Sequence, residues 1–278
     1  MPMFRWTRLS TQNMEEIWHL RLAELDPESI VMLTRPESRS LTLQVFSDKK
    51  TVTGLARKFG GKTARLSDLL PANTPHRPRA PLSIRGRLRI HSDEASWKTD
   101  PRPDSAILIP AGMAFGTGDH ATTATCLRIL CDLSPTLPSG WRALDAGTGS
   151  GILAIAAEKL GASSVEAFDF DPVCLRVTKE NARQNRCRKI TLAQADSRHP
   201  EQFQKADIIL ANLFSELLIA SAPGLLKKLR PAGHLIFSGV LKQQAAEVCA
   251  ALEQCGLTTP RLSLRGKWCA GITSRKKP

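Results

Sequence analysis

The chain has no long apolar segment, and this absence excludes several classes of protein. No apolar run reaches the roughly 18 residues that a membrane-spanning helix needs. The first twenty residues, MPMFRWTRLSTQNMEEIWHL, carry charge throughout and contain no apolar core of a secretion signal. We therefore expect a cytoplasmic protein that does not associate with membranes.

The chain also has no CxxC pair and no histidine spacing typical of a metal site. This pattern favours reduced, mostly buried thiols over disulfides or a bound metal. We therefore predict no metal site. The seven cysteines are Cys126, Cys131, Cys174, Cys187, Cys249, Cys255 and Cys269.

Positive charge exceeds negative charge by 13. Residues 1–100 contain 17 Lys and Arg against 11 Asp and Glu, and residues 101–278 contain 22 against 15, so the two parts carry +6 and +7. Such a charge favours encounter with an acidic partner such as ribosomal RNA. A generally basic proteome in the source organism would explain it equally well, so both interpretations stay open.

The pattern of apolar residues predicts two domains. Residues 1–75 mix short alternating stretches, such as LTLQVFS, with helical ones, such as KTVTGLARKFG, and this mixture predicts a small α+β domain. The proline-rich PANTPHRPRAPLS that follows indicates a linker or extended arm, which we place at 76–104. Within it, IRGRLRIHS is a strand that either closes the first domain or opens the second.

From about residue 105, short apolar β runs alternate with longer helical patterns. This rhythm predicts βαβ units, and hence an α/β domain over 105–278 with a doubly wound parallel sheet covered on both faces. The final PRLSLRGKWCAGITS has two strands separated by Arg265 and Gly266, which predicts an antiparallel hairpin at the edge. Five parallel strands followed by a hairpin give the order expected of a seven-stranded, Rossmann-like methyltransferase sheet.

The segment LDAGTGSG places Asp145, Gly147, Gly149 and Gly151 between an apolar strand and an Ala- and Leu-rich helix. Glycines here permit a tight turn and a close approach of ligand to backbone, with N–H groups available at the helix start. The spacing differs from the dinucleotide fingerprint, in which the third glycine comes three positions after the second. Asp145 would oppose a diphosphate and suits a cationic ligand such as S-adenosylmethionine.

Two later strands end in carboxylates. Asp169 lies 22 residues after Gly147, where an acidic side chain accepts hydrogen bonds from ribose hydroxyls, although a capping role is the alternative. Asp171 and Pro172 are typical of the start of a helix, with Asp171 as N-cap. Asp196 ends the third strand, where it either meets an adenine amino group or is a solvated turn residue.

Asn212 ends the fourth strand, at the carboxyl edge of the sheet where ligands and chemistry collect. Enzymes that methylate planar amino groups of adenine or glutamine carry N-P-P-Y or D-P-P-Y there, whereas this chain has N-L-F-S. The missing prolines and terminal aromatic argue against such planar targets. A strand-terminal turn is the alternative role for Asn212.

The segments AFGTGDHATTATCL, LDAGTGSGILAIAAEKLGA, DFDPVCLRVTKENARQN, ADIILANL and LIFSGVLKQQAAEV together resemble the PrmA family, the methyltransferases of large-subunit ribosomal protein L-eleven. The resemblance runs from about Pro110 to Lys276. It implies S-adenosylmethionine as cofactor, held by Thr123, Gly147, Asp169 and Asn212. To these the glycine turn adds Gly149.

The resemblance also implies methylation of lysine side chains and the N-terminal amine of the ribosomal protein, which the small N-terminal domain recognises. We expect a monomer and direct in-line methyl transfer, and we assign no catalytic residue. His120 is either a participant or a hydrogen-bond partner that orders its loop, and Phe115 and Phe214 either wall the methyl channel or pack in the core. Asp119 departs from the family, which usually has threonine there.

Other functions stay open. The short first domain would also suit a lysine methyltransferase of the electron-transfer flavoprotein β subunit. The charge and the arm suggest an RNA methyltransferase, although no cysteine lies in an obvious motif for methylation of pyrimidine carbons. A non-catalytic binding module and a nicotinamide dehydrogenase are disfavoured by the intact site residues and by the glycine spacing.

Overall fold

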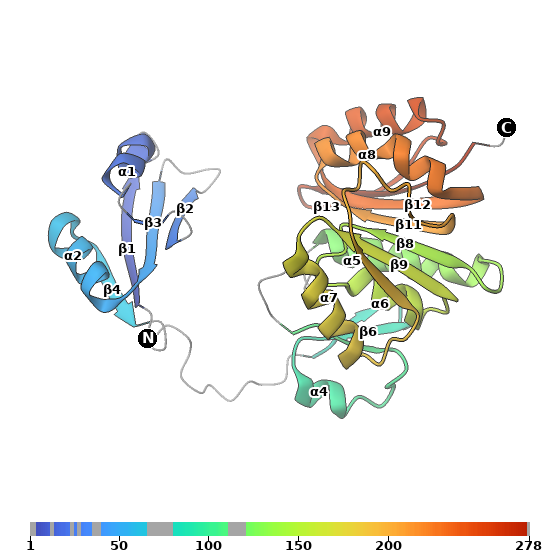
Figure 1. Ribbon diagram of the computed structural model, residues 1–278, viewed down its shortest axis with the longest axis horizontal. Helices are drawn as coiled ribbons and strands as arrows, with labels where there is room; N and C mark the ends of the chain where they lie inside the picture. Colours follow the sequence, from blue (N-terminus) through green and yellow to red (C-terminus); the bar gives the residue numbers. More distant parts are fainter. Residues whose placement is uncertain are drawn as a thin grey trace. The chain divides into compact units, whose positions relative to one another are not determined.

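The computed structural model describes residues 4–11, 14–22, 25–26, 29–34, 40–65, 80–110 and 121–276. The chain divides into two compact units, Met1–Arg77 and Pro78–Pro278, which we call the N-terminal and C-terminal units (Figure 1). Each unit is described by itself. A search of the described helices finds none that is long and apolar enough to cross a membrane.

The N-terminal unit is built on an antiparallel sheet with strand order β2-β3-β1-β4. It is an α+β structure, as predicted. Its elements are β1 (Phe4–Thr11), α1 (Glu15–Arg21), β2 (Ile30–Thr34), β3 (Ser40–Ser47), α2 (Lys49–Phe59) and β4 (Lys62–Arg65). The strand β1, which the sequence pattern did not reveal, lies inside this sheet between β3 and β4.

Aromatic side chains dominate the core of the N-terminal unit. Trp6 and Trp18 are buried, and their ring centroids are 6.2 Å apart. Phe59, at the end of α2, packs edge-on against Trp18 with centroids 5.4 Å apart. The Trp18 Nε1–H donates to Ser10 Oγ at 2.8 Å, so that this buried donor is satisfied.

The large sheet of the C-terminal unit has seven strands among the described residues, in the order β10-β9-β8-β11-β12-β14-β13. The first five run parallel, and β14 and β13 pair antiparallel as a hairpin. This confirms the predicted fold class. The strands are β8 (Arg142–Ala146), β9 (Ser164–Asp169), β10 (Ile190–Gln194), β11 (Ala206–Asn212), β12 (Leu229–Leu241), β13 (Arg261–Arg265) and β14 (Trp268–Ser274).

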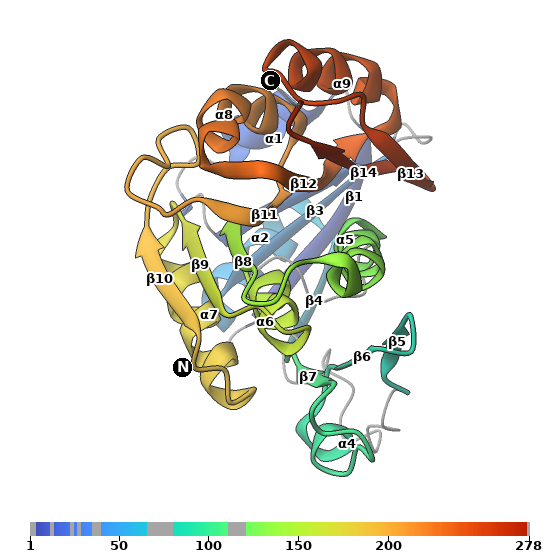
Figure 2. The same ribbon diagram turned by 90° about the vertical axis from the view of Figure 1, so that its right-hand side faces the viewer.

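Helices cover both faces of this sheet (Figure 2). One core joins the sheet to α5, α6 and α7 through residues such as Leu127, Ile155 and Ala182. A second core joins the opposite face to α8 and α9 through Leu218 and Val248. The helices are α5 (Ala121–Leu133), α6 (Ile152–Lys159), α7 (Pro172–Gln184), α8 (Ser215–Lys228) and α9 (Ala245–Gln254).

Residues 80–110 differ from the linker expected at 76–104, because they form part of the C-terminal unit. They hold β5 (Leu82–Ile84), β6 (Leu88–His91), α4 (Glu94–Lys98) and β7 (Ala106–Leu108). Strands β5, β6 and β7 form a small sheet. Ile84, Leu88 and Ile90 enter the same core as α5 and α6, so IRGRLRIHS opens the second unit and does not close the first. The sequence predicted this strand but left open the domain to which it belongs, because the partners that bury its apolar side are remote in sequence.

The seven cysteines all lie in the described part of the chain, and all are free thiols. Cys126, Cys131 and Cys269 are buried, whereas the other four are half-buried. Fewer thiols are therefore buried than the sequence led us to expect. Among the described residues, no cluster of three or more His, Cys, Asp or Glu is arranged to hold a metal ion.

Candidate functional site

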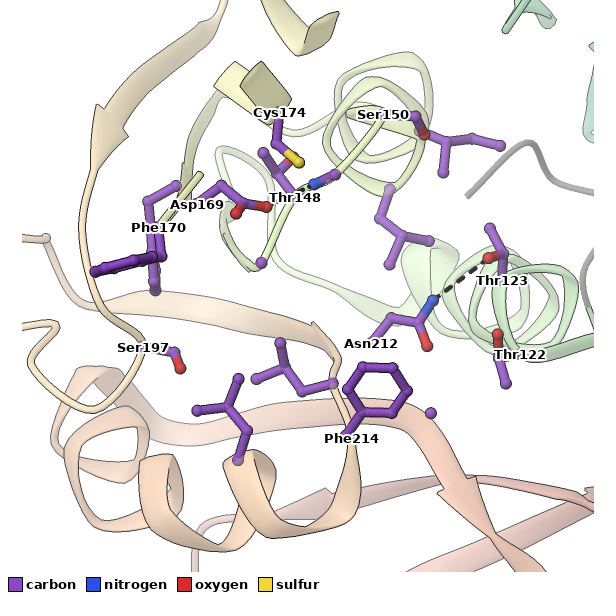
Figure 3. A pocket seen from close by; sticks show the side chains of 18 of the residues that line it. Thr122, Thr123, Thr148, Ser150, Asp169, Phe170, Cys174, Ser197, Asn212 and Phe214 are labelled. Atoms are coloured by element: carbon purple, nitrogen blue, oxygen red, sulfur yellow. Dashed lines mark hydrogen bonds between the residues drawn. The ribbon is translucent and has the colours of Figure 1, made fainter. Parts of the chain in front are cut away.

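A cavity of about 490 Å³ opens at the carboxyl edge of the large sheet, where parallel strands are followed by turns (Figure 3). The turns after β8, β9, β10 and β11 line it, together with the first turn of α5 and the start of β14. All five predicted cofactor-binding residues line this one cavity, namely Thr123, Gly147, Gly149, Asp169 and Asn212. The fold thus brings together residues that are up to 89 positions apart in sequence.

The glycine turn has left-handed backbone at each of its three glycines, with φ of 71° at Gly147, 56° at Gly149 and 81° at Gly151. A Cβ atom on Gly147 would lie 2.5 Å from Leu213 Cδ2. Glycine at position 147 is therefore required both by the backbone conformation and by the close packing of the turn after β11.

The N–H groups of this turn are used inside the protein. Gly147 N and Thr148 N donate to the Phe168 carbonyl oxygen at 2.9 and 3.0 Å, and Gly149 N donates to Asp169 Oδ2 at 3.0 Å. These three amides are therefore engaged within the protein, and their bonds fasten the turn to the end of β9. The expectation that N–H groups at the start of α6 are available to a ligand stays a prediction.

Asp145 has a different place from the one expected, because it does not line the cavity. Its carboxyl group is buried, and Oδ2 accepts hydrogen bonds from Thr148 Oγ1 at 2.7 Å and from Ala154 N at 3.2 Å. Among the described residues, Oδ1 has no partner. Burial raises the pKa of Asp145 to about 7. Asp145 thus holds the glycine turn against α6 and does not directly attract a cationic ligand.

Asp169 is oriented by two backbone donors. Its Oδ2 accepts from Gly149 N and its Oδ1 from Asp171 N, both at 3.0 Å. Asp171 in turn caps α7 by accepting from Val173 N at 2.7 Å, which confirms the predicted N-cap. Because a carboxylate oxygen can accept more than one bond, Asp169 keeps capacity for two ligand hydroxyls while its position is held.

Asp196 lines the cavity but is paired with a neighbour. Arg198 donates to both of its carboxylate oxygens, with both Nε contacts at 3.0 Å. These hydrogen bonds hold the pKa of Asp196 at about 2. An adenine amino group at Asp196 would therefore have to share a carboxylate that Arg198 already occupies. The assignment of Asp196 to adenine is for this reason weaker than the assignment of Asp169 to the ribose.

Asn212 and Thr123 meet on the other side of the cavity from Asp169 (Figure 3). Asn212 Nδ2 donates to Thr123 Oγ1 at 3.3 Å. Asn212 Oδ1 is buried and has no partner among the described residues. A buried amide oxygen without a partner is costly, so this acceptor is ready for a donor on a bound molecule.

Two exposed phenylalanines flank the cavity, and sequence reasoning gave them little weight. Phe170 follows Asp169 and is 74% exposed, whereas Phe214 begins α8 near Asn212 and is 72% exposed. Because Phe214 is exposed, core packing no longer explains it. The only sequence signal was an aromatic residue one or two positions after a polar strand end.

Comparison with known proteins supplies the family. The family model described as "Ribosomal protein L11 methyltransferase (PrmA)" matches residues 51–277. The chain belongs to the PrmA family. A ribosomal protein L11 methyltransferase of Rhizobium meliloti is 42% identical over 187 residues, which cover 66% of this chain and 64% of the relative.

A second PrmA relative, from Syntrophotalea carbinolica, is 39% identical over 188 residues, which cover 66% of this chain and 60% of the relative. The chain thus spans about three fifths of the length of these curated relatives. The crystal structure of a ribosomal protein L11 methylase from Lactobacillus delbrueckii subsp. bulgaricus is similar with a TM-score of 0.62 and 30% identity. That match covers 71% of this chain and all of the other.

One part of the PrmA resemblance lies outside the described residues. The first glycine turn, including Phe115, Asp119 and His120, falls within 111–120. The helix predicted to follow it begins at Ala121 as α5, and its buried Thr123 is the residue that reaches Asn212.

Proposed function

We propose that this chain is an S-adenosylmethionine-dependent methyltransferase of ribosomal protein L11, acting on lysine side chains and the N-terminal amine. One observation carries the proposal. Asn212, whose Oδ1 has no partner among the described residues, and the oriented carboxylate of Asp169 line the same cavity in a chain of the PrmA family. This pairs an acceptor for a ribose with an acceptor for an amine.

The residues of the cavity fit the cofactor. Asp169 would accept bonds from the ribose hydroxyls, Phe170 offers an aromatic face beside it, and Gly147 and Gly149 let the ligand approach the chain closely. Arg198, the basic residue among those that line the cavity, is neutralised by Asp196, as suits a ligand without phosphate. The cofactor supplies an already activated methyl group on its sulfonium.

The chain's own residues would orient the acceptor and exclude water. Asn212 Oδ1 would accept an N–H of the incoming amine, with Asn212 itself held by Thr123. A lysine amine has an ordinary pKa near 10.4, so losing its proton at pH 7 costs roughly 4–5 kcal/mol. Removal from water beside a cationic cofactor lowers that pKa, which makes a dedicated general base unnecessary.

We further propose that the N-terminal unit recognises the protein substrate. It has a core of its own, centred on Trp6 and Trp18, and the cavity lies entirely within the C-terminal unit. We also propose a monomer that contacts ribosomal RNA, in keeping with the net charge of +13.

The direct test is incubation of the purified chain and isotope-labelled S-adenosylmethionine with purified L11, with the electron-transfer flavoprotein β subunit and with ribosomal RNA. Mass spectrometry of the proteins should find added multiples of one methyl on L11 amines. Label only on the flavoprotein subunit or the RNA would replace the proposed substrate. Label on none, with no binding of the cofactor in calorimetry, would remove the proposed activity.

The variant Asp169→Ala tests the cofactor assignment. Losing hydrogen bonds to a charged group costs about 1.5–3 kcal/mol, so we expect the affinity for S-adenosylhomocysteine to fall about 10- to 150-fold. Asp171→Asn is the matched control, because it removes a nearby charge while keeping an N-cap. Equal affinity in Asp169→Ala and the control would contradict the ribose role.

A further inference from the structure

Three arginines from distant parts of the chain gather around α5. Arg128 lies in α5, Arg85 in the turn between β5 and β6, and Arg265 at the end of β13. Helix α5 lies between β5 and the β13–β14 hairpin and packs against both (Figure 2). Burial, and then the positive charges of Arg265 and Arg85, lower the pKa of Arg128. The guanidinium group of Arg128 is therefore repelled by each of the other two.

Acidic side chains neutralise this cluster only in part. Arg85 pairs with Asp132 at 2.8 Å, with both side chains about half exposed. Within the described residues, Arg128 and Arg265 have no ion pair. In contrast, Arg198 and Arg230 are each bound to an aspartate. Positive charge is thus left uncompensated at this place.

The pairing of the last two strands extends the cluster into a row. Arg261 lies opposite Ile272, and Arg265 lies opposite Trp268. Ile272 belongs to the core that contains α5, so the alternation of side chains places Arg261, Ser263 and Arg265 on the α5 side of the edge strand. All three are exposed. The two arginines are four steps apart along the strand, a distance of about 13 Å.

The turn that carries Arg85 has an unusual backbone. Arg85 has φ of 52°, a left-handed conformation that is unfavourable for a side chain other than glycine, and Gly86 follows with φ of 65°. Arg102 Nη1 donates to the Gly86 carbonyl oxygen at 3.0 Å and helps to hold the turn. The fold thus holds an arginine at a position where glycine or asparagine would adopt the backbone conformation at lower energy.

We infer that Arg85, Arg128, Arg261 and Arg265, which we call the arginine surface, bind the phosphate backbone of RNA. Planar guanidinium groups match phosphate oxygens with paired hydrogen bonds. Arg261 and Arg265 along the exposed edge strand, with Arg128 and Arg85 beside them, suit a linear polyanion, and such contacts do not depend on base sequence. None of the four arginines is among the described residues that line the cavity, although α5 carries both Thr123 and Arg128, and Arg265 lies opposite Trp268, which lines it.

The experiment measures binding of a fluorescently labelled, single-stranded RNA of mixed sequence to the full chain by anisotropy, over a range of KCl concentrations. The test variant is Arg128→Gln/Arg265→Gln. We expect its affinity to fall at least about tenfold near 100 mM KCl, and the slope of log K against log salt to be shallower by about 1.4, from about 0.7 for each lost phosphate contact.

The matched control is Arg176→Gln/Arg183→Gln, which removes the same charge from exposed positions on α7. An equal loss of RNA affinity in both double variants would overturn the inference, because net charge alone would then explain RNA binding. Unchanged RNA affinity together with lost binding to polyglutamate would assign the surface to acidic proteins and overturn the RNA assignment.

Titration with S-adenosylhomocysteine separates this inference from the proposed function. Both double variants should bind it normally, since neither alters a residue of the cavity. If the test variant loses binding of S-adenosylhomocysteine, the single variant Arg265→Gln, on the exposed edge strand, replaces it. The slope of log K against log salt for RNA binding by this single variant then tests the inference. A slope equal to that of the unchanged chain would contradict the inference.

Discussion

In the N-terminal unit, the described helices α1 and α2 pack against a small antiparallel sheet and form one core. In the C-terminal unit, helices cover both faces of a largely parallel sheet and form two cores. Parallel strands send all their carboxyl ends to one edge, where successive turns can share a ligand, whereas antiparallel neighbours alternate their ends. The difference explains why the cavity with Asp169 and Asn212 belongs to the C-terminal unit.

The family match follows the same division. It begins at residue 51 and continues to residue 277, so it includes the whole sheet of the cavity. Among the described elements of the N-terminal unit, only β4 lies wholly inside the match, together with all but the first two residues of α2. The sequence of a unit that builds a fixed chemical site is constrained at the many positions that shape that site. A unit that recognises a partner need only present a surface, and this agrees with the role we propose for it.

Removing residues 1–77 gives the largest expected effect on activity. The remaining unit contains every described residue that lines the cavity, so the affinity for S-adenosylhomocysteine should stay unchanged in calorimetry. Methylation of L11 should fall by more than about 100-fold, or about 2.7 kcal/mol of transition-state binding. Efficient methylation by the shortened chain would show that recognition does not need the N-terminal unit.

Gly147→Ala should destabilise the C-terminal unit alone. The backbone conformation costs roughly 1–2 kcal/mol for a residue with Cβ, and overpacking against Leu213 adds about 1–3 kcal/mol. Chemical denaturation followed by circular dichroism measures the loss. Gly140→Ala is the control, because Gly140 also has positive φ but has nothing within 4 Å of the added Cβ. Equal losses in the two variants would exclude the clash with Leu213.

Asp145 should make the stability of the C-terminal unit depend on pH. Its pKa rises from an ordinary 3.8 to about 7 in the fold, so the ionised form is disfavoured there. The free energy of unfolding should therefore fall by about 3–4 kcal/mol as the pH rises from about 4 to about 7, and then level off. Asp145→Asn should abolish this fall, and parallel pH profiles for the two proteins would refute the assignment.

Ser10→Ala should have the smallest effect and should be confined to the N-terminal unit. It removes the acceptor of the buried Trp18 Nε1–H, which costs about 1–2 kcal/mol. Tryptophan fluorescence during denaturation follows this unit through Trp6 and Trp18 once Trp97, Trp141 and Trp268 of the C-terminal unit have been replaced by phenylalanine. Ser10→Thr should restore most of the loss by keeping a hydroxyl, and cofactor affinity should not change in either variant. A change in that affinity would mean that the two units are coupled.

Much of the fold and site was predictable from local pattern. Glycines at every second position after an apolar strand predicted the turn at 147–151, and the next strand end predicted Asp169. The prediction failed where partners are remote. The strand at IRGRLRIHS was predicted, but its place in the core of the second unit was not. Strand β1 of the N-terminal unit gives a weak signal because its apolar side is used only once β3 and α2 pack against it.

The sequence by itself determined the α/β class, the glycine turn and the strand-end carboxylate, because each depends on residues a few positions apart and on the regular rise of strand or helix. Only the tertiary structure decided that Asn212, beside Thr123, has an oxygen without a partner in the described part of the chain, that Asp145 is buried behind the turn, and that α5 packs between the segments that carry Arg85 and Arg265. Burial and charge proximity are properties of packed elements, and packing joins residues that no local spacing connects.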